Sequence, residues 1–149
     1  MKKFLVSLIL FSSLNFVFWG AVPVVLGDEG LEPMEQSQAY QEFLKKPAND
    51  FSKMICLLNY FRTVPAVVQF EGIDYAPEFA YPIALVYLMT NYHNENPEQW
   101  ARKHCYRSIF NNRIIYLKFK DGSSRPARDV ILEKYHELEE AQRKRASQG

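Results

Sequence analysis

Seven consecutive apolar residues, Ile83 to Met89, lie near the middle of the chain and constrain its fold more than any other stretch. So short a run fits either a buried helix or a buried strand. Pro82 favours a helix, because proline suits a first turn, where its missing N–H has no intrahelical partner. Since the segment is apolar on every side, we predict a central helix over residues 82–92 that is buried all round. It is too short to span a bilayer.

A second helix is expected just beyond a polar turn. Asn96-Pro97-Glu98-Gln99 combines a favoured N-cap, a proline at the first helical position, an acid that complements the helix dipole and a residue suited to a capping box. We predict a helix from residue 97 to about residue 110. Its buried side follows i, i+4, i+8 spacing: Ala101, Cys105 and Ile109. A neighbouring face, expected to be partly exposed, carries Trp100, His104 and Arg107.

The first 27 residues have the pattern of a secretory signal peptide. Met1-Lys2-Lys3 is a short basic start that suggests a bacterial source, and residues 4–19 are apolar apart from three serines and one asparagine. Val25 and Gly27 suit the −3 and −1 positions of a cleavage site. We predict that residues 1–27 are removed and that the mature protein is extracytoplasmic, either periplasmic or secreted. Because the apolar region nearly reaches Leu26, an uncleaved membrane anchor through residues 4–26 is the alternative.

The remaining residues, 28–149, suit a single small domain. The full chain is 48% apolar and 15% aromatic, which is a globular and not a disordered composition. We predict an α+β, mostly α fold of about five helices with one short β element. Besides the two helices above, helices are expected over residues 33–46 and 51–61 and from residue 123 or 124 onward, with a frayed tail from about residue 140.

The best strand candidate is residues 113–120. Ile115, Leu117 and Phe119 alternate there with polar or amphipathic residues, which is the period of a half-buried strand. Asp121-Gly122 then marks a turn. A second possible strand, residues 63–70, contains Pro65, which would confine it to an edge or to its first residues; a helical continuation is the alternative.

The two cysteines, Cys56 and Cys105, are the only ones in the chain. In an exported protein an even pair is most simply one disulfide. We expect a Cys56–Cys105 bridge, closing a loop of about 50 residues that would stabilise the fold by about 4 kcal/mol on the chain-entropy model. Cys56 points away from the main apolar stripe of its helix, so the helix that carries Cys105 is expected to cover it. Two reduced, buried thiols are the alternative.

Charge is divided unevenly along the chain. Residues 28–98 carry 11 acids against four bases, net −7, and residues 99–149 carry 12 bases against six acids, net +6. Residues 102–128 hold eight bases against Asp121 alone, with aromatic residues interleaved. We predict a basic-aromatic binding face with these candidate residues: Trp100, Lys103, His104, Arg107, Arg113 and Lys118. The alternative is a solvated face that complements the acidic half of the chain.

The expected partner follows from the compartment. In the cytoplasm such a run would suggest nucleic acid. Beyond a secretion signal, nucleic acid is unlikely, and the basic face favours a protein partner with an acidic surface or, second, an anionic envelope polymer. A membrane contact is expected only through residues 4–26, if that segment stays uncleaved.

Catalytic motifs are absent from the sequence. It contains no HExxH, no Cys-x-x-Cys, no clustered metal-ligand spacing and no glycine-rich phosphate loop, so we expect neither a metal nor another cofactor. An enzyme is therefore the less favoured class. The form it would take is a small secreted enzyme that uses His104 with Cys105 or Glu95. A third possibility is a membrane-anchored structural subunit of an envelope complex.

Residues 83–110, with their NENPEQW turn, resemble a segment of small helical periplasmic immunity proteins that neutralise secreted bacterial toxins. The resemblance covers this segment only, and the further cysteine-proline features of that family are not found here. Together these patterns predict an exported small binding protein, of an adaptor, inhibitor or immunity type, that uses a basic-aromatic face around residues 100–128.

Overall fold

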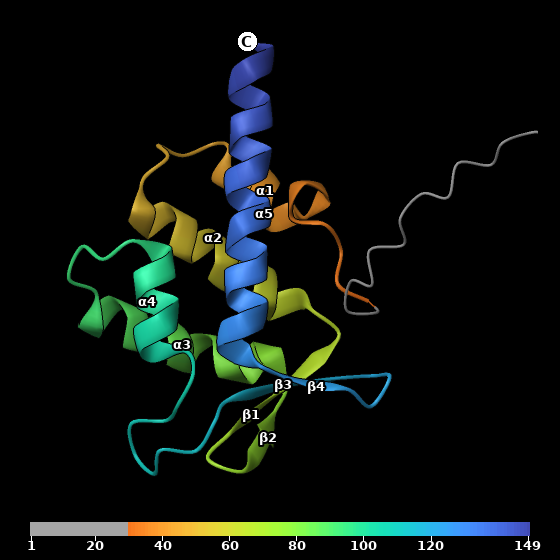
Figure 1. Ribbon diagram of the computed structural model, residues 1–149, viewed down its shortest axis with the longest axis vertical. Coiled ribbons are helices and arrows are strands. Elements are labelled where there is room, and N and C mark those ends of the chain that lie inside the picture. The colour runs from red at the N-terminus through yellow and green to blue at the C-terminus, as the bar shows by residue number, and fades with distance from the viewer. Residues whose placement is uncertain (1–29) are drawn as a thin grey trace, which may run out of the picture.

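The longest helix, α5 (Ala127–Gln148), runs through the middle of the molecule and begins at a small sheet (Figure 1). The computed structural model describes residues 30–149, so the predicted signal peptide, residues 1–27, lies outside the described residues. The described part is an α+β domain, mostly helical, with five α-helices, one 3-10 helix and a four-stranded sheet. The predicted class is confirmed, but the expectation of a single β element was wrong.

Helix α2 (Asp50–Thr63) separates two hydrophobic clusters. It begins as predicted, because the Asn49 side chain accepts from the Ser52 backbone N–H at 2.8 Å and the Ser52 hydroxyl accepts from the Asn49 N–H at 2.9 Å. One side of α2 lies in the main core, whose members include Cys56, Leu57 and Tyr60. The other side contributes Met54 to a smaller cluster with Leu88 and Trp100.

The main core is completed from both ends of the chain. Residues 33–46, predicted as one helix, form the 3-10 helix η1 (Met34–Gln36) and the short helix α1 (Gln38–Phe43). The break falls at Ser37, whose buried hydroxyl accepts from the Tyr40 N–H at 3.1 Å and so starts α1. Helix α5 supplies Val130 and Leu138, both fully buried.

Helix α5 starts later than predicted and extends further. Residues Ser124–Pro126 form the edge strand β4, so the helix begins at Ala127 and not at residue 123 or 124. It continues to Gln148, past residue 140 where the sequence predicts fraying. Among residues 30–149, no helix has both the length and the apolar content needed to cross a membrane.

Helix α3 (Pro77–Asn91) is not the buried central helix that the sequence predicted. Pro77 occupies its first turn, so the helix begins five residues earlier than expected and Pro82 lies inside it. One side packs on α2, but Pro77 and Leu88 are the only buried residues of α3. Helix α3 lies at the margin of the helical layer (Figure 1), so part of the apolar run Ile83–Met89 is exposed to solvent.

Helix α4 (Pro97–His104) has the predicted start and an earlier end. The Asn96 side chain accepts from the Gln99 N–H at 2.9 Å, which confirms the N-cap. The helix stops at His104 instead of about residue 110, and the chain continues into a loop. Ala101 is buried as expected, whereas Ile109 is exposed.

The sheet has the strand order β2-β1-β3-β4, and all its pairs are antiparallel. Strand β3 (Tyr116–Phe119) lies within the predicted segment, with Leu117 and Phe119 buried as expected. Strand β1 (Ala66–Phe70) is an inner strand, and Pro65 lies directly before its first residue, so of the two expected placements the one at the start of the strand is found and the edge position is not. A two-residue turn, Glu71-Gly72, with positive φ at both residues, joins it to β2 (Ile73–Tyr75), a strand that the sequence did not predict.

Candidate binding surface

The segment between α4 and β3, which we call the 105–115 loop, is folded back on itself as a hairpin-like turn. A bridge pairs Arg107 with Ile114. The Ser108 N–H donates to the Arg113 carbonyl at 2.8 Å, and the Ile115 N–H donates to the Tyr106 carbonyl at 2.9 Å. Backbone hydrogen bonds between the two arms fix the conformation of the loop, so its tip has a defined position relative to the arms.

Polar side chains inside the tip hold its apolar residues outward. Ser108 is buried, and its hydroxyl accepts from the Phe110 N–H at 3.0 Å. The Asn111 side chain accepts from the Arg113 N–H at 3.0 Å, and Asn112 adopts a positive φ of 61°, which asparagine tolerates well. As a result Ile109 and Phe110 are 67% and 76% exposed.

The loop is also braced against the sheet and α5. The Phe110 ring meets the Phe70 ring of β1 edge to face, with centroids 6.3 Å apart. On the other arm the Arg128 guanidinium lies 4.0 Å from the centroid of the Tyr106 ring. These two contacts attach the loop to neighbours distant in sequence while leaving most of Phe110 in solvent.

Two arginines flank the apolar tip without a carboxylate partner among the described residues. Arg107 donates to the Asn112 carbonyl at 2.8 Å, and Arg113 approaches the Glu71 carbonyl at 3.5 Å. Five other bases of the predicted run form ion pairs, in the pairs Arg102–Glu98, Lys103–Glu95, Lys118–Asp74, Arg125–Glu133 and Arg128–Asp129. Hydrogen bonds to carbonyl groups leave the positive charge of both arginines unneutralised. Lys120, the eighth base of the run, also has no ion pair among the described residues, but it lies in the turn after β3, so two of the three unpaired charges of the run lie in the loop.

The structure does not bring the six predicted binding residues together. Arg107 and Arg113 share the 105–115 loop. Lys103 instead pairs with Glu95, in the turn before α4, and Lys118 pairs with Asp74 on β2. Trp100 is only 7% exposed and belongs to the smaller hydrophobic cluster, so its prediction as a surface contact was wrong. Helix α4 turns its indole ring toward α2 and α3, where burial of its large apolar area is favourable.

The sequence analysis missed Ile109 and Phe110. It placed Ile109 on the buried stripe of a helix that was expected to continue to residue 110. The dipeptide Asn111-Asn112 favours a turn, but it follows the predicted end at about residue 110 and so does not place the end of the helix at His104.

His104 is half-buried beside the aromatic cluster. Its Nδ1 lies 2.9 Å from the Tyr87 hydroxyl, and its ring centroid lies 4.1 Å from that of Trp100. The Nε2 atom is buried and has no hydrogen-bond partner among the described residues. Burial lowers the pKa of His104, and the nearby Lys103 ammonium acts in the same direction. His104 is therefore a neutral packing residue at pH 7.

The alternative enzyme gains no support from these groups. Burial raises the pKa of the Cys105 thiol to about 12, so the nucleophilic thiolate is scarce at neutral pH. The Glu95 carboxylate accepts from the His93 N–H at 2.7 Å and contacts Lys103, and that backbone hydrogen bond is the main reason its pKa is lowered. The Glu95 carboxylate is therefore already bound by His93 and Lys103.

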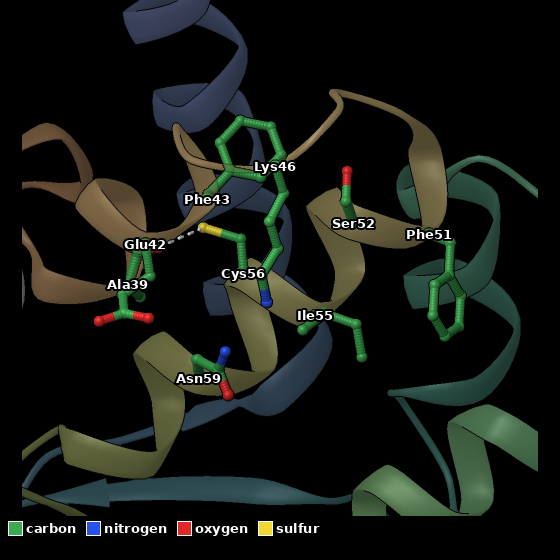
Figure 2. Close-up of a pocket in the computed structure, with 9 residues that line it drawn as sticks. All are labelled: Ala39, Glu42, Phe43, Lys46, Phe51, Ser52, Ile55, Cys56 and Asn59. Carbon is green, nitrogen blue, oxygen red and sulfur yellow. Dashed lines mark hydrogen bonds between the residues drawn. The ribbon is translucent and has the colours of Figure 1, made fainter.

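The expected Cys56–Cys105 disulfide is wrong in this structure, where both thiols are free. Cys56 lies in the main core and Cys105 in the smaller cluster, so the two sulfurs belong to different hydrophobic regions. The element that covers Cys56 is α1 and not α4: its thiol donates to the Ala39 carbonyl at 3.5 Å (Figure 2). Burial raises the pKa of Cys56 to about 12.

The hollow beside Cys56, between α1 and α2, has a volume of about 150 Å³ (Figure 2). Apolar side chains such as Phe43 and Ile55 line it together with the charged residues Glu42 and Lys46. Sites for small organic ligands measure about 300–1,000 Å³, so this hollow is too small for a typical ligand. Within residues 30–149, no three His, Cys, Asp or Glu side chains are grouped so that they could hold a metal ion.

Comparison with known proteins identifies no relative: no family model, curated protein or solved structure matches the chain. The 105–115 loop is therefore interpreted from its own geometry. Among the described residues, it combines a fixed backbone, exposed apolar side chains and arginines without acidic partners. These are properties of a surface that binds another molecule.

Proposed function

We propose that this chain is an exported binding protein that docks its 105–115 loop against an acidic protein surface. The observation that carries the proposal is the juxtaposition at the tip of the loop. Ile109 and Phe110 are exposed there, and Arg107 and Arg113 stand on either side without a carboxylate of their own. Export rests on the signal-peptide pattern of residues 1–27.

The tip has the composition of an interface core with a charged rim. Aromatic residues and arginine are enriched at interface hot spots, and a ring of charge around an apolar centre steers association and fixes orientation. Because internal hydrogen bonds already fix the loop, little conformational entropy would be lost on binding.

The apolar tip favours a protein over an anionic polymer as the partner. A polyanion would satisfy Arg107 and Arg113, but it would leave Ile109 and Phe110 in water. A protein surface with an apolar pocket and an acidic rim would bury both kinds of group at once.

Capture from an extracytoplasmic extract tests the proposal. The chain is produced with its own leader and carries a tag at its C-terminus, which lies at the far end of α5 from the loop (Figure 1). Reversing both loop charges, with Arg107→Glu and Arg113→Glu, should abolish retention of the partner. Phe110→Ala should weaken binding by about tenfold or more, as expected for a central hot-spot residue.

A double reversal at Arg143→Glu and Arg145→Glu is the matched control. Both side chains are exposed near the end of α5, and the change in net charge is the same. The control should retain the partner. Equal retention by the loop variant and the parent, or equal loss in both double variants, would reject the 105–115 loop as the binding surface.

A further inference from the structure

The outward side of α3 carries apolar side chains that no other described residue covers. Phe79, Ile83, Val86 and Met89 are 60–68% exposed, although they belong to one helix of a folded domain. Isolated exposed apolar residues are ordinary, but a group of this size marks a surface that binds something. This surface shares no residue with the 105–115 loop, so the inference does not rest on the proposed function.

The spacing of these residues is that of a helix-packing seam. Phe79, Pro82, Val86 and Met89 are separated by three, four and three residues, which is the alternation of a and d positions in a heptad, and Ile83 widens the seam. The opposite side of α3 already packs on α2, where Leu88 is buried and the Tyr81 hydroxyl donates to the Asn59 side chain at 2.9 Å. The outward seam therefore fits a second helix.

The charge pattern decides what kind of molecule supplies that helix. Residues 79–94 contain no Asp, Glu, Lys or Arg. An interfacial helix on an anionic membrane carries Lys or Arg beside its apolar face, and α3 has neither. A partner with an acidic surface would likewise find no base there.

A second copy of the chain can supply that helix, because its own α3 carries the same uncharged seam and neither side of the contact needs a charged group. In a twofold dimer the same patch faces itself, so a charge near the twofold axis would lie close to the same charge of the other copy. An uncharged apolar seam has no such conflict. We infer that α3 is the interface of a homodimer, in which two copies pack Phe79, Ile83, Val86 and Met89 against the same residues across a twofold axis.

The length of the seam sets the expected affinity. Fifteen residues make α3 about 22 Å long, so one α3–α3 pair buries less than the roughly 800 Å² per partner of a standard interface. A dimer of about micromolar affinity is expected, with dissociation on dilution.

Sedimentation velocity over about 1 to 200 µM, a range that brackets micromolar affinity, tests the inference. The sample is the chain as recovered after export, and its intact mass shows which residues it retains. The parent should sediment as a dimer at the upper concentration. Val86→Glu and Val86→Lys should each weaken the dimer by about a hundredfold or more, because each places unpaired charges in a desolvated contact.

Gln38→Glu is the control, since it adds the same charge as Val86→Glu at an exposed position on α1. It should remain dimeric, and far-UV circular dichroism should show the same helix content in all four proteins. A parent that is monomeric at about 200 µM would overturn the inference, because the expected affinity is micromolar. So would a dimer that survives both Val86 substitutions, or a monomer that uses Val86 to bind vesicles of phosphatidylcholine and phosphatidylglycerol.

Discussion

The buried ammonium group of Lys134 ties the start of the described chain to α5, and Lys134→Met tests that tie. Lys134 is only 3% exposed. Its Nζ donates to Glu137 Oε1 at 2.8 Å and to the Glu32 carbonyl at 3.3 Å, and it lies 5.4 Å from the centroid of the Tyr60 ring. The second oxygen of Glu137 accepts from the Met34 N–H at 2.9 Å. One ion pair thus holds residues 32–34 on the helix.

Methionine keeps the length of the side chain and most of its packing while removing the charge. The lost charge-assisted hydrogen bond contributes about 1.5 kcal/mol, the low end of its range, because the Glu137 side chain is 34% exposed and partly hydrated. The longer bond to Glu32 and the cation–π contact add about 0.5 kcal/mol each. Relief of the desolvated ammonium offsets part of this sum. We expect Lys134→Met to lower the free energy of unfolding by about 2 kcal/mol.

Urea unfolding followed by far-UV circular dichroism measures the change, and Lys144→Met is the control on the same helix. Lys144 pairs with Glu140 at 3.0 Å, but both side chains are more than half exposed, so this substitution should leave the unfolding midpoint unchanged. Equal midpoints for the two variants, or a Lys134→Met protein more stable than its parent, would refute the reasoning.

Three further predictions concern groups near the candidate surface. Thiol titration of the unfolded, unreduced protein should find two reactive cysteines, and the native protein should react slowly because burial raises both pKa values to about 12; no free thiol would restore the disulfide. The pKa of His104 lies below its ordinary value of 6.5, so only the unfolded state takes up a proton as the pH first falls through that value, and stability should decline until the folded-state pKa is reached. Replacing it in His104→Gln should reduce this decline, and identical pH dependence in both proteins would contradict the assignment. Gly72→Ala should lower the melting temperature, because its φ is +83° and the added Cβ would lie 2.7 Å from Arg113 Nη1; an unchanged melting temperature would argue against this turn.

Local signals predicted the fold well wherever they were self-contained. The Asn96 cap, the Asp121-Gly122 turn and the alternation in β3 act over a few residues, and all are present in the structure. Burial of the apolar run in α3 was not predictable in this way. Whether an apolar helix lies inside a domain or at its margin depends on how many other elements cover it, and that is settled by the tertiary arrangement.

The small strands escaped prediction for a related reason. Strands β2 and β4 are three residues each, too short to show a period, and β4 ends in a proline that also suits a helix start. They exist because β1 and β3 offer edges on which they can pair.

The binding face over residues 100–128 stays a prediction, but the structure changes which of its residues are exposed and unpaired. Charge patterning indicated residues 100–128, and Arg107 and Arg113 do occupy an exposed loop there. Pairing with Asp74 removed Lys118 from the set, and packing removed Trp100, because both depend on segments distant in sequence. The exposure of Ile109 and Phe110 was not predicted, because it depends on where α4 ends.

Hydrogen exchange of the chain with and without the protein it captures tests the central claim most directly. Binding at the 105–115 loop predicts slower exchange of backbone amides in residues 106–114 when the partner is added, with the C-terminal half of α5 unchanged. Protection confined to α1 or the end of α5, with the exchange of residues 106–114 unaltered, would contradict the account.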